Sequence, residues 1–226
     1  MNLTLALESS AKAASVALCD GGTLIAQSFQ NAGLTHSQTL LKMTEDMLRS
    51  CGVKLADVAR IAVAAGPGSF TGIRIGVAAA KGLAWGSGKP LRGVSTLRAT
   101  VSATELPGVL CPVMDARRGE VYNAVFRYDD GLYLRECDDR AVSLEVLADE
   151  ARNRAVPYVL LGDGAELAYE VFRANHLNAV LAPELLRLQC AYGVAVASLG
   201  AADATELEPM YLRLSQAERE LTERGL

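Results

Sequence analysis

Histidine is scarce in this chain, whose 226 residues include only His36 and His176. A zinc peptidase needs paired ligands, for example two histidines on adjacent turns of one helix. The two histidines are far apart in the sequence and neither has a neighbouring histidine. We therefore predict that each histidine lies at a helix end and that the chain holds no metal. Because the paired histidine ligands are missing, we exclude a metallopeptidase.

Cysteine is present, but no two cysteines form a CxxC pair. The sequence therefore offers neither a zinc ribbon nor a thioredoxin-like redox site. Each cysteine lies among apolar residues, where a thiol behaves as a small hydrophobic side chain. Unpaired cysteines also fit a reducing cytosol. The five are Cys19, Cys51, Cys111, Cys137 and Cys190.

Clusters of positive charge and long apolar runs are missing as well. The 22 basic residues are scattered and outnumbered by 26 acidic ones, which argues against binding nucleic acid by bulk electrostatics. The longest mainly apolar run, 188–202, is too short and too polar to cross a bilayer. The first apolar stretch has no basic segment before it and is interrupted by Glu8. We expect a cytoplasmic protein without a membrane partner.

The order of predicted elements is the same in the two halves of the chain. Each half has three strands, a helix, a strand and a second helix, in a composition of 50% hydrophobic and 21% charged residues that is typical of globular proteins. The first-half segments are 2–8, 15–20, 23–29, 36–51, 58–65 and a helix reaching about Gly86. The second-half segments are 109–114, 120–128, 132–137, 143–154, 158–161 and 165–176.

This repeat predicts an α/β protein with a two-lobed actin-like (ribonuclease H-like) fold. Each lobe would be a mixed sheet made of a three-strand meander plus further strands, covered by helices. We expect the first lobe to span 1–104 and to be completed by the C-terminal segment 207–226. The second, smaller lobe would span 105–206.

A glycine-rich turn, Gly66-Pro67-Gly68, joins a buried strand to a helix. It matches neither a Walker A loop nor a dinucleotide fingerprint. Two interpretations stay open: the loop presents free N–H groups to an anion, or the glycines only permit a sharp turn and close packing. The segment 115–120 is also ambiguous, since it suits a solvated hairpin turn with an internal ion pair or a polar rim beside a cleft between the lobes. The candidate ligand residues are Glu8, Gly66, Gly68, Ser69, Thr71, Asp115, Arg117 and Glu120.

The two helices of the first half carry more apolar surface than one sheet contact needs. In the helix 36–51 the apolar side chains span an arc of roughly 160°, against about 100° for an ordinary surface helix. The following helix has only Arg74 and Lys81 as long polar residues before Trp85. Such helices are either buried in their own fold or form a subunit contact, and the width of the first arc favours the contact. The candidate interface residues are Leu40, Met43, Met47, Leu48, Ile73 and Val77.

The run AGPGSFTGIRIGVAAAKGLAW, residues 65–85, resembles the signature of the TsaB (YeaZ) family. The resemblance extends in the right order from Leu3 to about Arg213. Further matching segments are His36-Ser37, 93–97, 115–122, 162–164 and 209–213. One departure is the first loop, Leu7-Glu8-Ser9-Ser10, where the family more usually has an Asp-Thr-Ser type sequence.

This resemblance implies a non-catalytic scaffold or activating subunit of the bacterial complex that installs threonylcarbamoyl on the tRNA adenosine beside the anticodon. The expected partner is TsaD in a heterodimer, with TsaE in the larger assembly and a homodimer when the chain is alone. The tRNA would be met only through the complex. We assign no catalytic residue and no cofactor to the chain itself, and leave ATP or ADP to the assembled complex.

The alternative function is an autonomous ATP-dependent enzyme of the actin and sugar-kinase superfamily. Such an enzyme needs acidic residues around Mg²⁺ and phosphate-binding turns in both lobes. Glu8, Asp115 and Asp163 follow predicted strands and are the acids that could converge. Asp also caps turns routinely, and we favour that interpretation of these residues.

Overall fold

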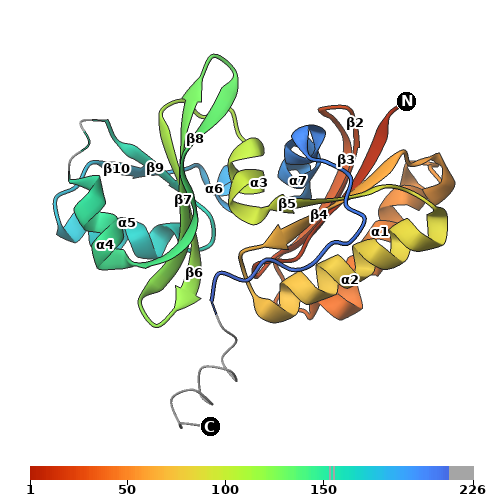
Figure 1. Ribbon diagram of the computed structural model, residues 1–226, viewed down its shortest axis with the longest axis horizontal. Helices are drawn as coiled ribbons and strands as arrows, with labels where there is room; N and C mark the ends of the chain where they lie inside the picture. Colours follow the sequence, from red (N-terminus) through yellow and green to blue (C-terminus); the bar gives the residue numbers. More distant parts are fainter. Residues whose placement is uncertain (153, 155, 214–226) are drawn as a thin grey trace, which may run out of the picture.

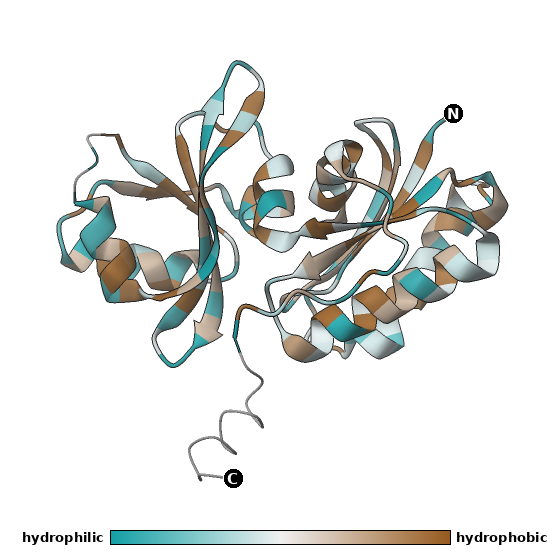
Figure 2. Cartoon of the chain, viewed as in Figure 1, coloured by the Kyte–Doolittle hydropathy of each residue, from teal (hydrophilic) through white to brown (hydrophobic). Residues whose placement is uncertain are grey.

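The computed structural model describes residues 1–152, 154 and 156–213. Figure 1 shows two lobes side by side, each built on one sheet with helices packed against it. In Figure 2 the more hydrophobic residues concentrate on the strands and on the helix surfaces that face them. Each lobe therefore has its own core, as the repeated sequence pattern predicts.

Both sheets have five strands in the same order. The first consists of β1 Leu3–Glu8, β2 Ala14–Asp20, β3 Thr23–Gln30, β4 Arg60–Gly66 and β5 Leu91–Ser95, ordered β3-β2-β1-β4-β5. The second consists of β6 Val109–Arg117, β7 Glu120–Asp129, β8 Leu132–Ser143, β9 Tyr158–Leu161 and β10 Ala179–Leu181, ordered β8-β7-β6-β9-β10 when counted from the matching edge. In each sheet an antiparallel meander is extended by two parallel strands. The predicted fold class is confirmed.

The helices begin and end at residues suited to those positions. Ser69 caps α2 by accepting a hydrogen bond from the N–H of Gly72, and Gly88 ends it in the left-handed conformation. Ser143 caps α4 in the same way, by accepting a hydrogen bond from the N–H of Val146. The described helices are α1 His36–Ser50, α2 Phe70–Ser87, α3 Thr96–Ser102, α4 Leu144–Ala151, α5 Ala165–Ala174, α6 Glu184–Arg187 and α7 Ala191–Ala197, with 3₁₀ turns η1 Leu55–Asp57 and η2 Ser198–Gly200.

Five of these helices and strands were not predicted from the sequence, because each is short: β5, α3, β10, α6 and α7. The strand β8 is longer than predicted and continues through the charged residues 138–140. It does so because β8 is an edge strand, paired only with β7, so that polar side chains reach water there.

The helix α7 belongs to the first lobe, which corrects the predicted boundary at residue 206. It packs on β1 and β2 and against α3. Ala191, Val194 and Ala195 share a buried cluster with Ala6 and Ala62 of the first sheet. The chain therefore returns to the first lobe by Ala191, earlier than the predicted 207. Leu207, Met210 and Tyr211 contact the first lobe, whereas Leu212 and Arg213 contact the second. Residues 214–226 fall outside the described residues.

The apolar arc of α1 faces the chain's own core, which corrects our interface prediction. α1 contacts β2, β3 and α2 together, so one helix buries a wide arc within its own lobe. Leu40, Met47, Leu48, Ile73 and Val77 are all buried in this core, and Met43 packs against it. The expectation that these side chains are exposed in the free subunit is wrong.

Within the described part of the chain, no helix is both long and apolar enough to cross a membrane.

Candidate functional site

A polar cleft of about 570 Å³ lies between the two lobes. Its walls come from the segments that follow β1, β4 and β9, from the carboxyl end of β6 and from Tyr122 of β7. β1 and β4 run parallel in the first sheet and β6 and β9 in the second, so their carboxyl ends meet at the same crevice, where open α/β sheets bind ligands. The lining residues are Ser10, Ala11, Lys12, Gly68, Ser69, Phe70, Thr71, Met114, Asp115, Ala116, Arg117, Tyr122 and Asp163.

The glycine loop packs directly on the turn that follows β1. The N–H of Ser69 donates to the carbonyl oxygen of Ser10 at 2.7 Å. Gly68 has φ +155°, and a Cβ there would lie 2.4 Å from that same oxygen. This position therefore requires glycine. Close packing accounts for the glycine, while Ser69 and Thr71 still face the cleft.

The charged segment at the β6–β7 turn combines both of its predicted interpretations. Arg117 and Asp115 form an ion pair at 3.3 Å, and the N–H of Arg117 donates to Oδ1 of Asp115. Both residues also line the cleft, opposite Lys12. Beside them, burial raises the pKa of Asp163, whose Oδ1 accepts a hydrogen bond from Gln189 at 3.2 Å. The cleft thus carries two cations and two carboxyl groups.

Glu8 lies beneath this cleft and does not line it. Its Oε1 accepts hydrogen bonds from the backbone N–H of Ser10 at 2.6 Å and from the Ser10 hydroxyl at 2.5 Å. Burial raises the pKa of Glu8 to about 7, an effect that Ser10 reduces and the charge of Asp163 increases. The sequence interpretation of Glu8 as a ligand residue is therefore wrong.

Two other predicted ligand residues also point elsewhere. A Cβ on Gly66 would lie 2.3 Å from the carbonyl oxygen of Met210, so Gly66 faces the C-terminal segment. Glu120 forms an ion pair with Arg213 at 2.5 Å. The residues that the structure does bring together in the cleft are Gly68, Ser69, Thr71, Asp115 and Arg117.

The acidic residues do not fit a magnesium–nucleotide site of the kinase type. Glu8 is fully enclosed and bound to Ser10, while Asp115 is engaged by Arg117. Among the described residues no group of three His, Cys, Asp or Glu side chains could hold a metal ion.

The C-terminal segment 204–213, which we call the C-terminal strap, binds both lobes. Its Met210 N–H donates to the carbonyl oxygen of Ala65 at 2.6 Å. The Tyr211 ring stacks on Phe70 with centroids 4.4 Å apart, and Arg74 donates to the Tyr211 hydroxyl. Arg213 reaches the second lobe through Glu120 and the carbonyl of Ala116. We expected the segment 207–226 to complete the first lobe, but no pattern in the sequence predicted its contacts with the second lobe.

We expect the substitution Glu8→Gln to remove part of the pH dependence of stability. The folded chain holds the Glu8 proton up to about pH 7, whereas an unfolded chain releases it near the ordinary glutamate pKa of 4.5. Wild type therefore loses stability as the pH rises through this window, because the unfolded state binds fewer protons.

Between pH 5 and pH 8 the free energy of unfolding of Glu8→Gln should gain about 2–3 kcal/mol relative to wild type. Urea unfolding at both pH values measures it, with the exposed Glu45→Gln as control. Parallel pH profiles for Glu8→Gln and wild type would contradict the buried proton.

Two duplicated lobes of this strand order, closed around a polar cleft at the strand ends, define an actin-like protein. A family model described as TsaD, tRNA N6-adenosine threonylcarbamoyltransferase, matches residues 30–166.

Two curated relatives carry the name tRNA threonylcarbamoyladenosine biosynthesis protein TsaB. The Bacillus subtilis protein is 31% identical over 95% of both chains. The Escherichia coli protein is 33% identical over 96% of this chain and 97% of its own. The structure of YeaZ from Pseudomonas aeruginosa superposes with a TM-score of 0.79 at 28% identity, covering 94% of this chain and 100% of that one. The chain belongs to the TsaB (YeaZ) family, which confirms the resemblance found in the sequence.

Proposed function

We propose that this chain acts in tRNA threonylcarbamoyladenosine biosynthesis as a non-catalytic subunit that pairs with a TsaD-type transferase. The relatives that match over nearly their whole length are named for this pathway. The TsaD family model matches more than half of the chain, so the partner would have a similar fold. We propose a cytoplasmic location, and contact with tRNA only within the complex.

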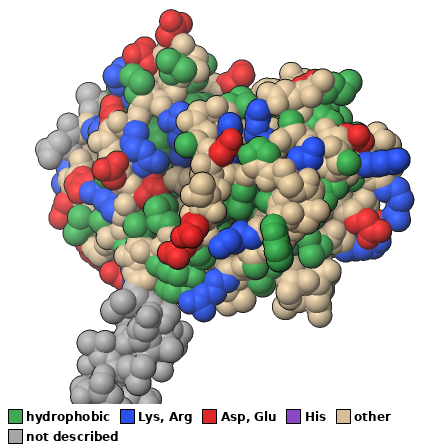
Figure 3. All heavy atoms as spheres, turned by 45° about the vertical axis from the view of Figure 1, so that its right-hand side comes forward, with side chains coloured by type: hydrophobic (Ala, Val, Ile, Leu, Met, Phe, Trp, Pro, Cys, Tyr) green, Lys and Arg blue, Asp and Glu red, His purple; other side chains and the backbone are tan. Residues whose placement is uncertain are grey.

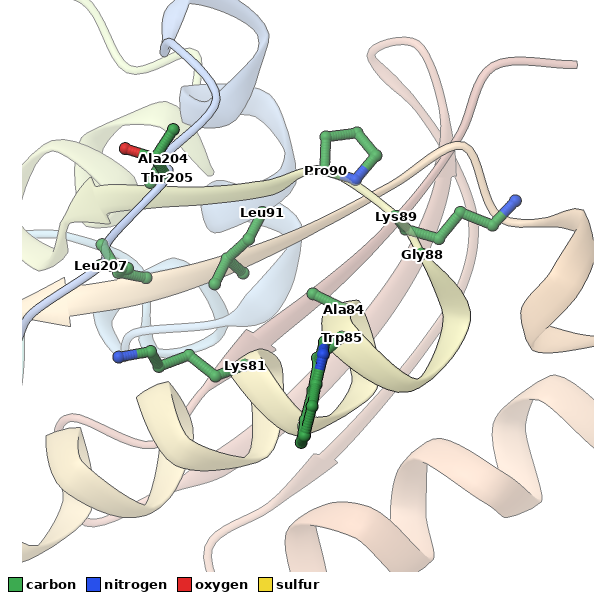
Figure 4. A pocket seen from close by; sticks show the side chains of 11 residues that line it. Lys81, Ala84, Trp85, Gly88, Lys89, Pro90, Leu91, Ala204, Thr205 and Leu207 are labelled. Carbon is green, nitrogen blue, oxygen red and sulfur yellow. The ribbon is translucent and has the colours of Figure 1, made fainter.

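The proposed pairing rests on the exposed outer face of α2, which is the side of the helix turned away from the sheet. Trp85 is 91% exposed there. Figure 4 shows its ring standing off the helix, away from Leu91 and Leu207, while Lys81 extends from the same helix. Gly82 and Ala78 lie one and two turns earlier, respectively, and are also exposed. We call Arg74, Ala78, Lys81, Gly82 and Trp85 the α2 outer face.

This face suits a protein partner by shape and by charge. A Cβ added to Gly82 would meet nothing within 4 Å, so another backbone can approach closely. α2 contains no acidic residue, and among the described residues Lys81 forms no ion pair. A partner that brings carboxylates to Arg74 and Lys81 and an apolar side chain to Trp85 would be complementary. Figure 3 shows hydrophobic side chains between Lys and Arg on the side that carries this lobe.

The cleft supports a role without catalysis of its own. Its nearest buried acid, Glu8, is enclosed, and burial raises its pKa to about 7. Of the charged groups that line the cleft, Asp115 is paired with Arg117, and Asp163 accepts a hydrogen bond from Gln189. In the absence of TsaD we propose that two copies cover the α2 outer face by a two-fold contact.

We expect Trp85→Asp to weaken pairing with the cognate TsaD by more than about tenfold, because an exposed tryptophan is a common interface anchor and a charge there must be desolvated. The melting temperature should stay near that of wild type, since Trp85 contributes little to the core. Surface plasmon resonance with immobilised TsaD measures the affinity, and light scattering measures self-association.

Leu185→Asp is the matched control, because Leu185 is 97% exposed on α6 of the second lobe. Its pairing with TsaD should equal that of wild type. Unchanged affinity for Trp85→Asp, or an equal loss for Leu185→Asp, would overturn the α2 outer face as the contact. ATP turnover by the purified chain alone would instead favour the autonomous enzyme.

A further inference from the structure

Two arginines from different lobes converge where α3 meets β8. Arg98 lies on α3 and Arg135 on β8, and both guanidinium groups lie over the ring of Phe126, at 5.7 and 4.6 Å from its centroid. Both side chains line one cavity of about 400 Å³. The other lining residues are Gly93, Val94, Ser95, Ala197, Gly200 and Ala201, none of which lines the cleft between the lobes.

Arg98 has few partners for a charged group in its position. A guanidinium has five N–H donors. Within the part of the chain that the structure describes, the side chain of Arg98 makes one hydrogen bond, from Nη1 to the carbonyl oxygen of Tyr133 at 2.6 Å. Among the described residues it forms no ion pair. Burial and the like charge of Arg135 both lower the pKa of Arg98. The Phe126 ring offsets part of this cost but supplies no hydrogen-bond acceptor.

Arg135 is better compensated, since it forms an ion pair with Asp139 at 2.5 Å. The neighbouring Arg92 is likewise engaged, by Asp203 and by the carbonyl oxygen of Ser198. The positive charge of Arg98 is therefore not balanced by a carboxylate in an ion pair. This charge lies at the edge of an open cavity. Free guanidinium donors facing such a cavity are a good match for an oxyanion.

We propose that Arg98 and Arg135 form a binding site for a phosphate group, separate from the cleft and from the α2 outer face. The planar fork of each guanidinium binds phosphate oxygens in pairs, and two forks suit a dianion better than a single carboxylate. Small residues such as Gly93 and Gly200 leave room for the group that carries the phosphate. The phosphate comes either from a small molecule or from an RNA backbone.

Calorimetry on the full chain at low salt tests this site, with inorganic pyrophosphate as the first probe and a tRNA as the second. We expect Arg98→Gln and Arg135→Gln each to weaken binding of at least one probe by about tenfold or more. The control Arg127→Gln removes the same charge at an exposed position of β7, where Arg127 already pairs with Asp129 and Glu136. It should bind as wild type does.

Thermal melts show whether Arg98→Gln is folded. If it folds poorly, Arg98→Lys is used as a second variant. Lysine keeps the positive charge but lacks the planar guanidinium group. The affinity of Arg98→Lys for the probe should therefore lie between that of wild type and that of Arg98→Gln. An Arg98-dependent loss for pyrophosphate indicates a small-molecule phosphate, and a loss for tRNA alone indicates an RNA backbone. Failure of both probes to bind, or equal losses in the Arg127→Gln control, would overturn the proposal. Pairing with TsaD, measured on the same variants, should not change, so the two proposals fail separately.

Discussion

Met47→Asp is expected to lower the melting temperature by about 10 °C or more, because it places an unpaired carboxylate in the core of the first lobe. Met47 is 5% exposed and packs in the same cluster as Leu40 and Ile73. Losing its apolar contacts and burying a charge together cost several kcal/mol. Each kcal/mol corresponds to about 2–4 °C for a chain of this size.

Leu41→Asp is the matched control on the same helix, since Leu41 is 51% exposed. It should melt within a few degrees of wild type. Differential scanning fluorimetry of both variants is sufficient to compare them. If Met47→Asp melted like wild type and lost only its pairing with TsaD, α1 would present Met47 outward and our correction would be wrong.

Gly72→Ala is expected to destabilise the chain by about 2–4 kcal/mol, because α2 approaches the segment after β1 through this residue. A Cβ on Gly72 would lie 2.1 Å from the carbonyl oxygen of Ser9. That oxygen belongs to the backbone and cannot turn aside. In addition, the Ser9 hydroxyl donates to the carbonyl oxygen of Gly72 at 2.9 Å, so displacing the helix also breaks this bond.

Gly82→Ala on the same helix should have the opposite sign. Its Cβ would meet nothing within 4 Å, so the variant should gain about 0.5–1 kcal/mol from helix propensity. Chemical unfolding of both variants gives the comparison directly. Equal effects at the two positions would show that the contact with Ser9 does not determine the cost at Gly72.

The local pattern of apolar and turn residues in the sequence was sufficient to predict the two-lobed α/β architecture. Alternating apolar residues such as those of β1, and turns such as Asp20-Gly21-Gly22, predicted the strands of both meanders. The repeat of element order then predicted two lobes, and the sheets have the same strand order. These features were accessible because periodicity and turn chemistry depend on neighbours in the sequence.

The sequence could not tell which side of a helix faces its own core. The wide apolar arc of α1 is covered by three elements, β2, β3 and α2. The sequence of one helix does not show how many elements pack against it. Nor could it tell that Glu8 is enclosed by Ser10, or that α7 returns to the first sheet. In each case the outcome depends on segments far apart in the sequence.

The sequence by itself therefore determined the fold class, the family and five residues of the cleft wall. Only the tertiary structure decided the helix surface that stays exposed around Trp85, the strap that joins the lobes through Arg213, and the meeting of Arg98 with Arg135. The physical reason is that secondary structure follows from local periodicity, whereas exposure and charge pairing follow from long-range packing, which brings together residues that share no pattern in the chain.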